Sequence, residues 1–145
     1  MLFRSLLLDL EEVLAGNTLG ELCADHRWKL VAGDFFESVP PGDLYTLKNV
    51  LHDWNDEQCV RILRNCRDAM NPGGRIIAID AVLPDGNEPH FGKQVDIMML
   101  LLASGQERTR PEFDHLFTSA GLRITRVLPI TGAYSLSVIE AEAPD

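Results

Sequence analysis

The stretch Leu47-Lys48-Asn49-Val50-Leu51-His52-Asp53-Trp54 stands between a short apolar run and an amphipathic segment, and it decides the fold class. The run that leads into it, Leu44–Leu47, is typical of a strand buried on both faces of a parallel sheet. After the stretch, Asn55 is a good helix N-cap with Gln58 three residues later, and apolar residues then recur at helical spacing. His52 is therefore expected on the connection between the carboxyl end of a strand and the start of a helix.

The rest of the chain continues this alternation of short apolar runs and helical spacing. The other runs that predict buried strands are Leu6–Leu8, Trp28–Val31 and Arg75–Val82. Two more helices are predicted, an apolar one over Gly92–Ala103 and one that follows a capping box of Thr109 and Glu112. The last two runs, Leu122–Leu128 and Tyr134–Ala141, predict a terminal hairpin. These patterns predict an α/β sheet that finishes in two neighbouring strands.

Polar residues stand at or near the carboxyl ends of the four predicted parallel strands. They are Asp9, Asp34, His52 and Asp80. In an open α/β sheet, the loops at this edge face a common crevice in which ligands bind. For any single aspartate the alternative is a cap of the next turn or helix. Four such placements at one edge favour a ligand site.

Histidine is suited to general-base catalysis near neutral pH, because its ordinary pKa is about 6.5. His52 is the candidate for this role, and the alternative is a structural histidine with a hydrogen-bonded ring. A His-Asp pair also suggests a metal site. However, His26, His90 and His115 stand in helix or loop contexts without ligand spacing, so no metal ion is predicted.

Two of the strand-end aspartates have neighbours that nucleotide binding uses. Asp9 follows an apolar strand and opens a helical segment, which suits a carboxylate that accepts hydrogen bonds from both hydroxyls of a ribose. Asp34 with Phe35 is suited to hold an adenine ring and stack against it. The alternative is that Phe35 and Phe36 belong to the core.

Six motifs of this chain resemble, in order and spacing, those of the caffeate- and flavonoid-type plant O-methyltransferases. Bacterial relatives that methylate polyketides and similar hydroxylated metabolites are closer in style. The motifs are Asp9-Leu10-Glu11-Glu12-Val13, Gly33-Asp34-Phe35-Phe36, Leu47–Trp54, Asn71-Pro72-Gly73-Gly74-Arg75, Asp80 before Val82-Leu83-Pro84, and Gly105-Gln106-Glu107-Arg108-Thr109. The resemblance implies a Rossmann-like class I methyltransferase sheet with a terminal antiparallel hairpin. It also implies S-adenosyl-L-methionine as co-substrate and a small aromatic or polyketide-like acceptor.

The resemblance implies a role for each matching residue. His52 falls on the catalytic base, and Asp80 and Glu107 fall on the two acids that flank and orient it. The family usually has Glu at the first of these two positions. The cofactor contacts fall on Asp9 for the ribose, Asp34 and Phe35 for the adenine, and Lys48 near the methionyl part. The acceptor contacts fall on Asp53, Met98 and Met99, with core packing as the alternative for the two methionines.

The resemblance also implies what surrounds residues 1–145, which correspond to part of a methyltransferase catalytic domain. Relatives are homodimers with a helical dimerisation domain, followed by a first strand and a glycine-rich loop that embraces the cofactor. No Gly-x-Gly-x-Gly occurs in the 145 residues. Since that strand lies between the strand ending at Asp9 and the one leading to His52, we expect unpaired edges there. We also expect weaker cofactor binding without that region.

The composition argues against several other functions. With 13 basic and 22 acidic residues the net charge is −9, which disfavours nucleic acid and anionic membrane partners. Three cysteines without a CxxC pair and an N-terminus without a signal or spanning segment favour a cytoplasmic protein.

Two rival functions are retained beside the methyltransferase. One is a truncated or decayed non-catalytic binding or structural module of the same fold. The other is a nicotinamide oxidoreductase, since Asp9 would serve that ribose equally well. This second rival is disfavoured, because no glycine fingerprint is present and Tyr45 and Lys48 are one residue too close for a Tyr-x-x-x-Lys pair.

Overall fold

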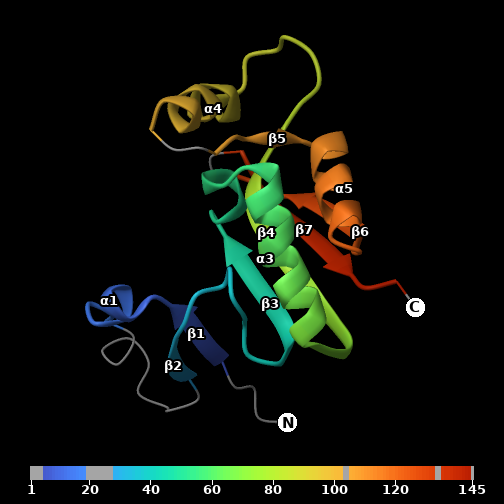
Figure 1. The fold of residues 1–145 in the computed structure, drawn as a ribbon. Coiled ribbons are helices and arrows are strands. Elements are labelled where there is room, and N and C mark those ends of the chain that lie inside the picture. The colour runs from blue at the N-terminus through green and yellow to red at the C-terminus, as the bar shows by residue number, and fades with distance from the viewer. Residues whose placement is uncertain (1–4, 19–27, 103–104, 133–134, 145) are drawn as a thin grey trace.

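The computed structural model describes residues 5–18, 28–102, 105–132 and 135–144. These residues form strands and helices that alternate along the chain (Figure 1). The strands are β1 (Ser5–Asp9), β2 (Trp28–Ala32), β3 (Gly42–Lys48), β4 (Met70–Leu83), β5 (Arg108–Thr109), β6 (Arg123–Pro129) and β7 (Leu136–Glu142). The helices are α1 (Glu11–Leu14), the 3-10 turn η1 (Leu51–Asp53), α3 (Asp56–Ala69), α4 (Phe91–Leu102) and α5 (Arg110–Ser119).

The main sheet has five strands. Four of them lie in the order β3-β4-β7-β6, and the short β5 pairs with the carboxyl end of β4. β3 and β4 run parallel, and the residues that lead from one to the other form α3. β7 is antiparallel to both β4 and β6, so the chain ends in the predicted hairpin. The predicted α/β fold is therefore confirmed.

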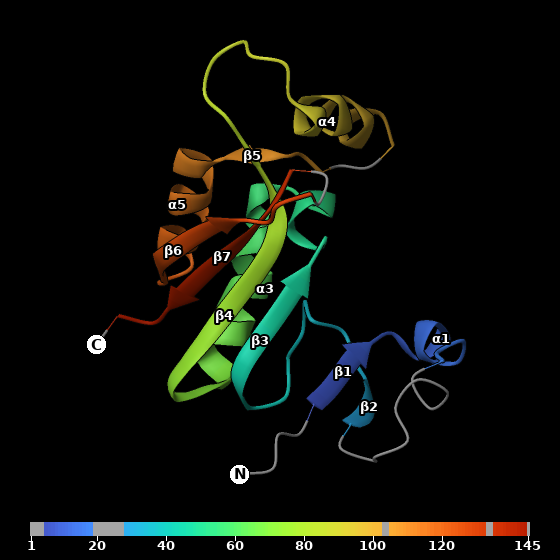
Figure 2. The same ribbon diagram turned by 180° about the vertical axis from the view of Figure 1, so that it is seen from behind.

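The core lies between one face of this sheet and the helices α3 and α5, which cover that face together (Figure 1). Alternation along the strands decides which residues enter it, because side chains of a strand point to opposite faces in turn. The fully buried apolar residues of the sheet are Ile76, Ala78, Ile139 and Ala141. The opposite face, seen in Figure 2, carries no helix of the described part of the chain.

The capping residues place α3 and α5 as predicted. The Asn55 side chain accepts from the Gln58 amide at 3.0 Å, and the Gln58 side chain accepts from the Asn55 amide at 3.3 Å. At the start of α5, the Glu112 carboxylate accepts from the Thr109 amide at 2.7 Å. Both helices therefore begin where the sequence predicts them.

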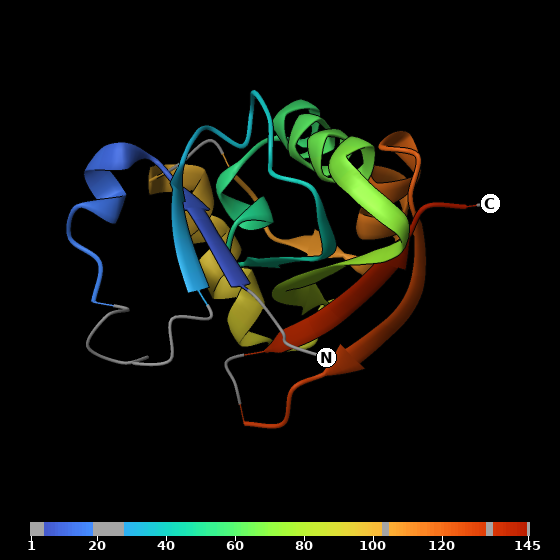
Figure 3. The ribbon, with the colours of Figure 1, turned by 90° about the horizontal axis from the view of Figure 1, so that it is seen from below.

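A second, two-stranded sheet is formed by β1 and β2, which pair in parallel from Ser5 opposite Trp28 to Asp9 opposite Ala32. β1 and β3 point the same way (Figure 2), and Figure 3 shows β1 and β2 set beside the main sheet. Among the described residues, β1 pairs with β2 alone and β3 pairs with β4 alone. The expectation of unpaired edges on β1 and β3 agrees with this pairing.

One detail differs from the expectations, and some expected residues lie outside the described ranges. The strand predicted over Arg75–Val82 is longer than expected, because β4 begins at Met70, directly after α3, and includes Asn71–Gly74. Asp80 lies inside β4, three residues before its end, which agrees with its expected place near the carboxyl end of that strand. Cys23, His26, Ala103 and Tyr134 lie outside the described residues.

Candidate active site

The 3-10 turn η1 carries His52 at the carboxyl end of β3, and the segment before β5 supplies its partner. His52 Nδ1 lies 2.9 Å from Glu107 Oε1, across 55 residues of sequence. A carboxylate accepts hydrogen bonds and does not donate them, so Nδ1 carries the proton of this bond. In the neutral ring, Nε2 is then the nitrogen with a free lone pair.

Glu107 is itself held in place. Its side chain is 2% exposed, and its backbone amide donates to Asp96 Oδ1 of α4 at 2.8 Å. Two residues earlier, Gly105 passes so close to η1 that a Cβ would overlap the His52 carbonyl oxygen. Only glycine allows the chain to approach the turn in this way. The Gly105–Glu107 segment is thus packed directly on the turn that bears His52.

Asp80 is the second carboxyl of the cluster, and it lies on β4, on the buried side of the turn that bears His52. The alternation of β4 turns it to the same face as Ile76 and Ala78, and its exposed fraction is 0%. No described residue donates a hydrogen bond of normal geometry to either carboxyl oxygen, and the same holds for Glu107 Oε2. The structure therefore brings Asp80 near His52 without a hydrogen bond between them.

The surroundings change the proton affinity of two of these groups. The pKa of Asp80 is raised to about 7 by burial and by the Glu107 charge, although the charges of His52 and Arg108 and the nearby Leu51 amide lower it. The hydrogen bond to Glu107 raises the pKa of His52 above 6.5, although partial burial acts in the opposite direction. The ring is a stronger base than a free histidine as a result.

The open side of the ring faces a third carboxylate. Asp53 Oδ1 lies 3.4 Å from His52 Nε2, and the Asp53 side chain is 48% exposed. His52 itself is 17% exposed, so the Nε2 side of the pair is near the surface. A proton taken up at Nε2 would be stabilised by Asp53, and a polar ligand is able to approach the same atoms.

The residues expected to hold a nucleotide stand at the carboxyl ends of β1, β2 and β3. Asp9 ends β1, where its Oδ1 accepts from the Leu10 amide at 2.8 Å. The Asp9 carbonyl accepts from the Gly33 amide at 3.0 Å, which brings the Asp34 turn next to it. Lys48 is the last residue of β3 and is exposed. These donors and acceptors fit the ribose, adenine and methionyl groups of S-adenosylmethionine.

Asp34 and Phe35 have local contacts as well. Asp34 Oδ1 accepts from the Phe36 amide at 2.7 Å, which is the turn-capping role named as the alternative. The Phe35 ring is partly buried and packs edge-on against Phe36 and Trp54, with centroid distances of 4.9 and 6.2 Å. The structural and the binding roles are compatible, since each carboxylate has a second oxygen and each ring a second face.

The two methionines lie on α4, which stands at the carboxyl end of the sheet (Figure 1). Met98 is 51% exposed and Met99 is half-buried, so core packing does not describe Met98. Ile97, Leu100 and Leu101 are 61%, 77% and 76% exposed. Neither α4 nor another helix of the described residues is long and apolar enough to cross a membrane.

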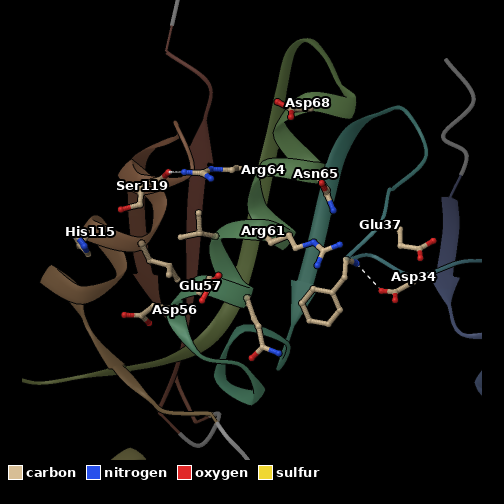
Figure 4. Close-up of a pocket in the computed structure, with 14 residues that line it drawn as sticks. Asp34, Glu37, Asp56, Glu57, Arg61, Arg64, Asn65, Asp68, His115 and Ser119 are labelled. Carbon is tan, nitrogen blue, oxygen red and sulfur yellow. Dashed lines mark hydrogen bonds between the residues drawn. The ribbon is translucent and has the colours of Figure 1, made fainter.

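A separate hollow of about 890 Å³ runs along the outer side of α3, between α5 and the Asp34 turn (Figure 4). Half of its lining residues are charged, including Asp34, Glu57, Arg61 and Arg64, whereas His52, Asp80 and Glu107 do not line it. Among the described residues, a histidine meets two buried carboxyl groups at His52, away from this hollow. In the described ranges, no three His, Cys, Asp or Glu side chains form a metal-binding group.

Solved structures with the same fold define the class of this chain. CalO1, a methyltransferase in calicheamicin biosynthesis solved in its SAH-bound form, is 45% identical with a TM-score of 0.90. The match covers 97% of this chain and 42% of that chain. NcsB1, an O-methyltransferase from neocarzinostatin biosynthesis solved with S-adenosyl-L-homocysteine and 1,4-dihydroxy-2-naphthoic acid, is 35% identical with a TM-score of 0.83 and the same coverage. The fold is that of the class I S-adenosylmethionine-dependent methyltransferases.

Sequence comparison identifies the family within this class. The O-methyltransferase domain family matches residues 2–123, and the chain belongs to this family. Phenazine O-methyltransferase PhzM of Lysobacter antibioticus is 48% identical over 128 residues, which are 88% of this chain and 37% of that protein. Mitomycin biosynthesis 6-O-methyltransferase of Streptomyces lavendulae is 40% identical over 130 residues, 89% of this chain and 35% of that protein. The chain thus spans little more than a third of the length of these relatives.

Three residues around His52 were not singled out by the sequence. Asp96 accepts from the Glu107 amide, Gly105 packs against the His52 carbonyl, and Arg108, which donates to the Leu51 carbonyl, is 1% exposed. Gly105 and Arg108 belong to the motif that contains Glu107, which is the only signal that pointed to them. Asp96 had no such signal, because a single aspartate in an apolar helix is typical of many helices.

Proposed function

We propose that residues 1–145 form part of the catalytic domain of an S-adenosylmethionine-dependent O-methyltransferase in which His52 is the general base. The acceptor is a hydroxyl group of a small aromatic or polyketide-like metabolite. One observation carries this proposal: Glu107 holds Nδ1 of the ring at 2.9 Å, which leaves Nε2 as the basic atom on the more exposed side. This arrangement fixes the tautomer that a general base needs.

The residues would act on the proton of the acceptor. A phenol has a pKa of about 10, so almost none of it is ionised at neutral pH without a base. The hydroxyl proton passes to His52 Nε2, and the electron pair left on oxygen forms the new bond to carbon. When bound, S-adenosylmethionine supplies the methyl group on a sulfonium sulfur and leaves as S-adenosylhomocysteine. Glu107 and Asp53 then stabilise the imidazolium from its two sides.

Four residues at or just after the carboxyl ends of β1, β2 and β3 would bind the cofactor. We assign Asp9 to the ribose hydroxyls, Asp34 and Phe35 to the adenine, and Lys48 to the methionyl part. Their place at one edge of three parallel strands supports this assignment, since ligands of open α/β sheets bind there. The SAH-bound relatives with TM-scores of 0.90 and 0.83 support it further.

The acceptor would lie between η1 and α4. Asp53 is next to the basic nitrogen, and Met98 and Met99 offer flexible apolar contacts for an aromatic ring. The dihydroxynaphthoic acid bound to NcsB1 and the phenazine and mitomycin relatives support a flat, hydroxylated acceptor. The identity of the acceptor follows only from a direct assay.

The second candidate function is a non-catalytic module that pairs with another polypeptide. The exposed apolar residues of α4 and β1 favour it, since monomeric proteins rarely leave such surfaces open. The two candidates differ in a simple way. The enzyme transfers methyl groups at a rate that depends on His52, whereas the module shows no turnover under any condition.

The test measures methyl transfer with isotope-labelled S-adenosylmethionine and a panel of phenols, read by mass spectrometry. The chain is assayed alone and fused behind the upstream portion of the Lysobacter phenazine O-methyltransferase, which supplies the part of the relative that this chain does not match. His52→Ala is expected to lower kcat by roughly a hundredfold to ten-thousandfold with little change in the affinity for S-adenosylhomocysteine. His115→Ala, an exposed histidine of α5, is the matched control and is expected to change neither.

Two outcomes would contradict the proposal. Methyl transfer that survives His52→Ala at the original rate would remove His52 as the base. The absence of turnover in both forms, across the whole panel and with S-adenosylhomocysteine bound, would favour the non-catalytic module.

A further inference from the structure

Arg108 is a charged side chain that the proposed reaction does not use, and only 1% of its surface is exposed. Its guanidinium makes five hydrogen bonds. They run from Nη1 to the Leu51 carbonyl at 2.9 Å and the Gln106 carbonyl at 3.3 Å, from Nη2 to the Trp54 carbonyl at 2.9 Å and Asp56 Oδ1 at 2.7 Å, and from Nε to Asp56 Oδ1 at 2.9 Å.

Two of these partners enclose the proposed base. Leu51 directly precedes His52 and Trp54 follows it by two residues. Arg108 therefore donates hydrogen bonds to the backbone on both sides of His52. The turn itself supplies two long backbone hydrogen bonds, from the Asp53 amide to the Val50 carbonyl at 3.2 Å and from the Trp54 amide to the Leu51 carbonyl at 3.4 Å. The Cys59 thiol lies 3.1 and 3.5 Å from the same two carbonyls and adds weak donation from α3.

Arg108 and its neighbour Glu107 hold the same turn in two different ways. Glu107 accepts a hydrogen bond from Nδ1 of the His52 ring, while Arg108 donates to the backbone carbonyl of the residue before His52. Successive residues of an extended segment point to opposite sides, which allows adjacent residues to reach ring and backbone. Asp56 balances the buried positive charge, and Gln106 also donates to it at 3.1 Å.

We propose that Arg108 is a positioning residue that fixes the Leu51–Trp54 backbone and thereby keeps the His52 ring against Glu107. The proposal rests on the function proposed above for His52. A planar guanidinium reaches two carbonyls and a carboxylate at once, whereas a lysine ammonium is a single point of charge on a flexible stem. A residue that only filled space in the core would not control the ring.

The test follows the His52 ring directly, by NMR titration of its imidazole signals in the full chain, together with hydrogen exchange of the Leu51–Trp54 amides. In Arg108→Gln, the His52 pKa is expected to fall toward 6.5, because the hydrogen bond to Glu107 is its main elevating contact. Amide exchange in the turn is expected to become about tenfold faster or more. In the active form, kcat is expected to fall while KM for S-adenosylmethionine changes less than about twofold.

Arg67→Gln is the matched control, since Arg67 also joins a carboxylate and a backbone carbonyl, namely Asp68 and Ala120, but away from the turn. It is expected to leave the His52 titration unchanged. If Arg108→Gln does not fold, Arg108→Lys and Asp56→Asn replace it, since each weakens the network without emptying the core. Both are expected to shift the titration in the same direction by less.

A folded Arg108 variant with the wild-type His52 titration and wild-type exchange in the turn would overturn the proposal. The same result in both Arg108→Lys and Asp56→Asn, where Arg108→Gln does not fold, would overturn it as well. Neither readout needs methyl transfer. A shifted titration combined with full activity of His52→Ala would therefore reject the proposed function and leave the positioning of His52 by Arg108 in place.

Discussion

The five-stranded sheet and the two-stranded sheet divide the proposed site between them, and they differ in how they are packed. His52 and Glu107 stand at the end of the larger sheet, where β4 and β7 bring four apolar residues to 0% exposure. Asp9 stands at the end of the smaller sheet, where Leu6 and Leu7 of β1 are 49% and 39% exposed. The proposed base is thus built on the packed half, and the proposed ribose contact on the open half.

An aromatic cluster connects the two halves. Phe35 and Phe36 follow β2, and both rings contact Trp54, which follows the turn that bears His52, with centroid distances of 6.2 and 4.8 Å. The Asn65 side chain of α3 donates to the Phe35 carbonyl at 2.8 Å and fixes this turn to the main body. The difference between the halves suggests that the base is preorganised, whereas cofactor binding contributes to the order of β1 and β2.

The largest expected effect separates the halves by stability. Phe117→Ala removes a fully buried ring from α5 and is expected to lower the free energy of unfolding by about 3 to 5 kcal/mol, because a cavity remains. Leu7→Ala in β1 is expected to cost less than about 1 kcal/mol, since its side chain is already partly in water. Urea unfolding followed by circular dichroism measures both. Equal losses in the two variants would contradict the difference in packing.

The next effect concerns the buried carboxyl of the packed half. The pKa of Asp80 is about 7 in the folded chain against 3.8 in an unperturbed aspartate, so the folded state binds more protons between these values. Stability therefore falls as the pH rises from about 4 to about 7 and then levels off. The loss is at most about 4 kcal/mol, since each pKa unit is worth about 1.4 kcal/mol.

Asp80→Asn tests this, because an amide has no charge to bury. The variant is expected to be more stable than the wild type at pH 8 and to lose that advantage at pH 4, as measured by urea unfolding at a series of pH values. Asp114→Asn, in an exposed pair with Arg110, is the control and is expected to change stability by less than about 1 kcal/mol. A wild-type stability that rises from pH 5 to pH 8 would argue against a raised Asp80 pKa.

More of the fold than of the candidate site could be predicted from the sequence. Strand and helix periodicity, with the Asn55 and Thr109 caps, placed the elements within a few residues, because these signals are local. The burial of Asp80 was readable too, since it shares the alternation of Ile76 and Ala78. Contacts between residues that are 50 or more positions apart could not be predicted from such local signals. The pairing of His52 with Glu107 rested on resemblance alone, and the Arg108 contacts depend on how closely Gly105 passes the turn.

A smaller effect is expected from ligand binding, and it should appear in the open half. At a hundredfold excess over Kd, S-adenosylhomocysteine stabilises the bound state by about 2.7 kcal/mol. Amides of β1 and β2 are expected to gain protection from hydrogen exchange, whereas those of β4 and β7 are protected already. Asp9→Ala is expected to lose this gain. Asp43→Ala, a carboxylate at the opposite end of β3, is expected to keep it. Protection of β4 and β7 alone would contradict the assignment of Asp9.

The smallest expected effect is a displacement along the pH axis. Glu107→Gln keeps an acceptor for His52 Nδ1 and hence the tautomer, but it replaces a charged partner by a neutral one, a difference of about 1 kcal/mol in the hydrogen bond. The His52 pKa falls as a result, and since only the unprotonated ring accepts a proton, the rising limb of kcat against pH moves to lower pH. The variant should therefore retain a larger fraction of its plateau rate at pH 6 than the wild type does. Asp9→Asn, in the open half, should change KM and leave the limb in place. If the rising limb of kcat against pH is unchanged in Glu107→Gln but shifts in Asp9→Asn, the proton-accepting group lies outside the packed half.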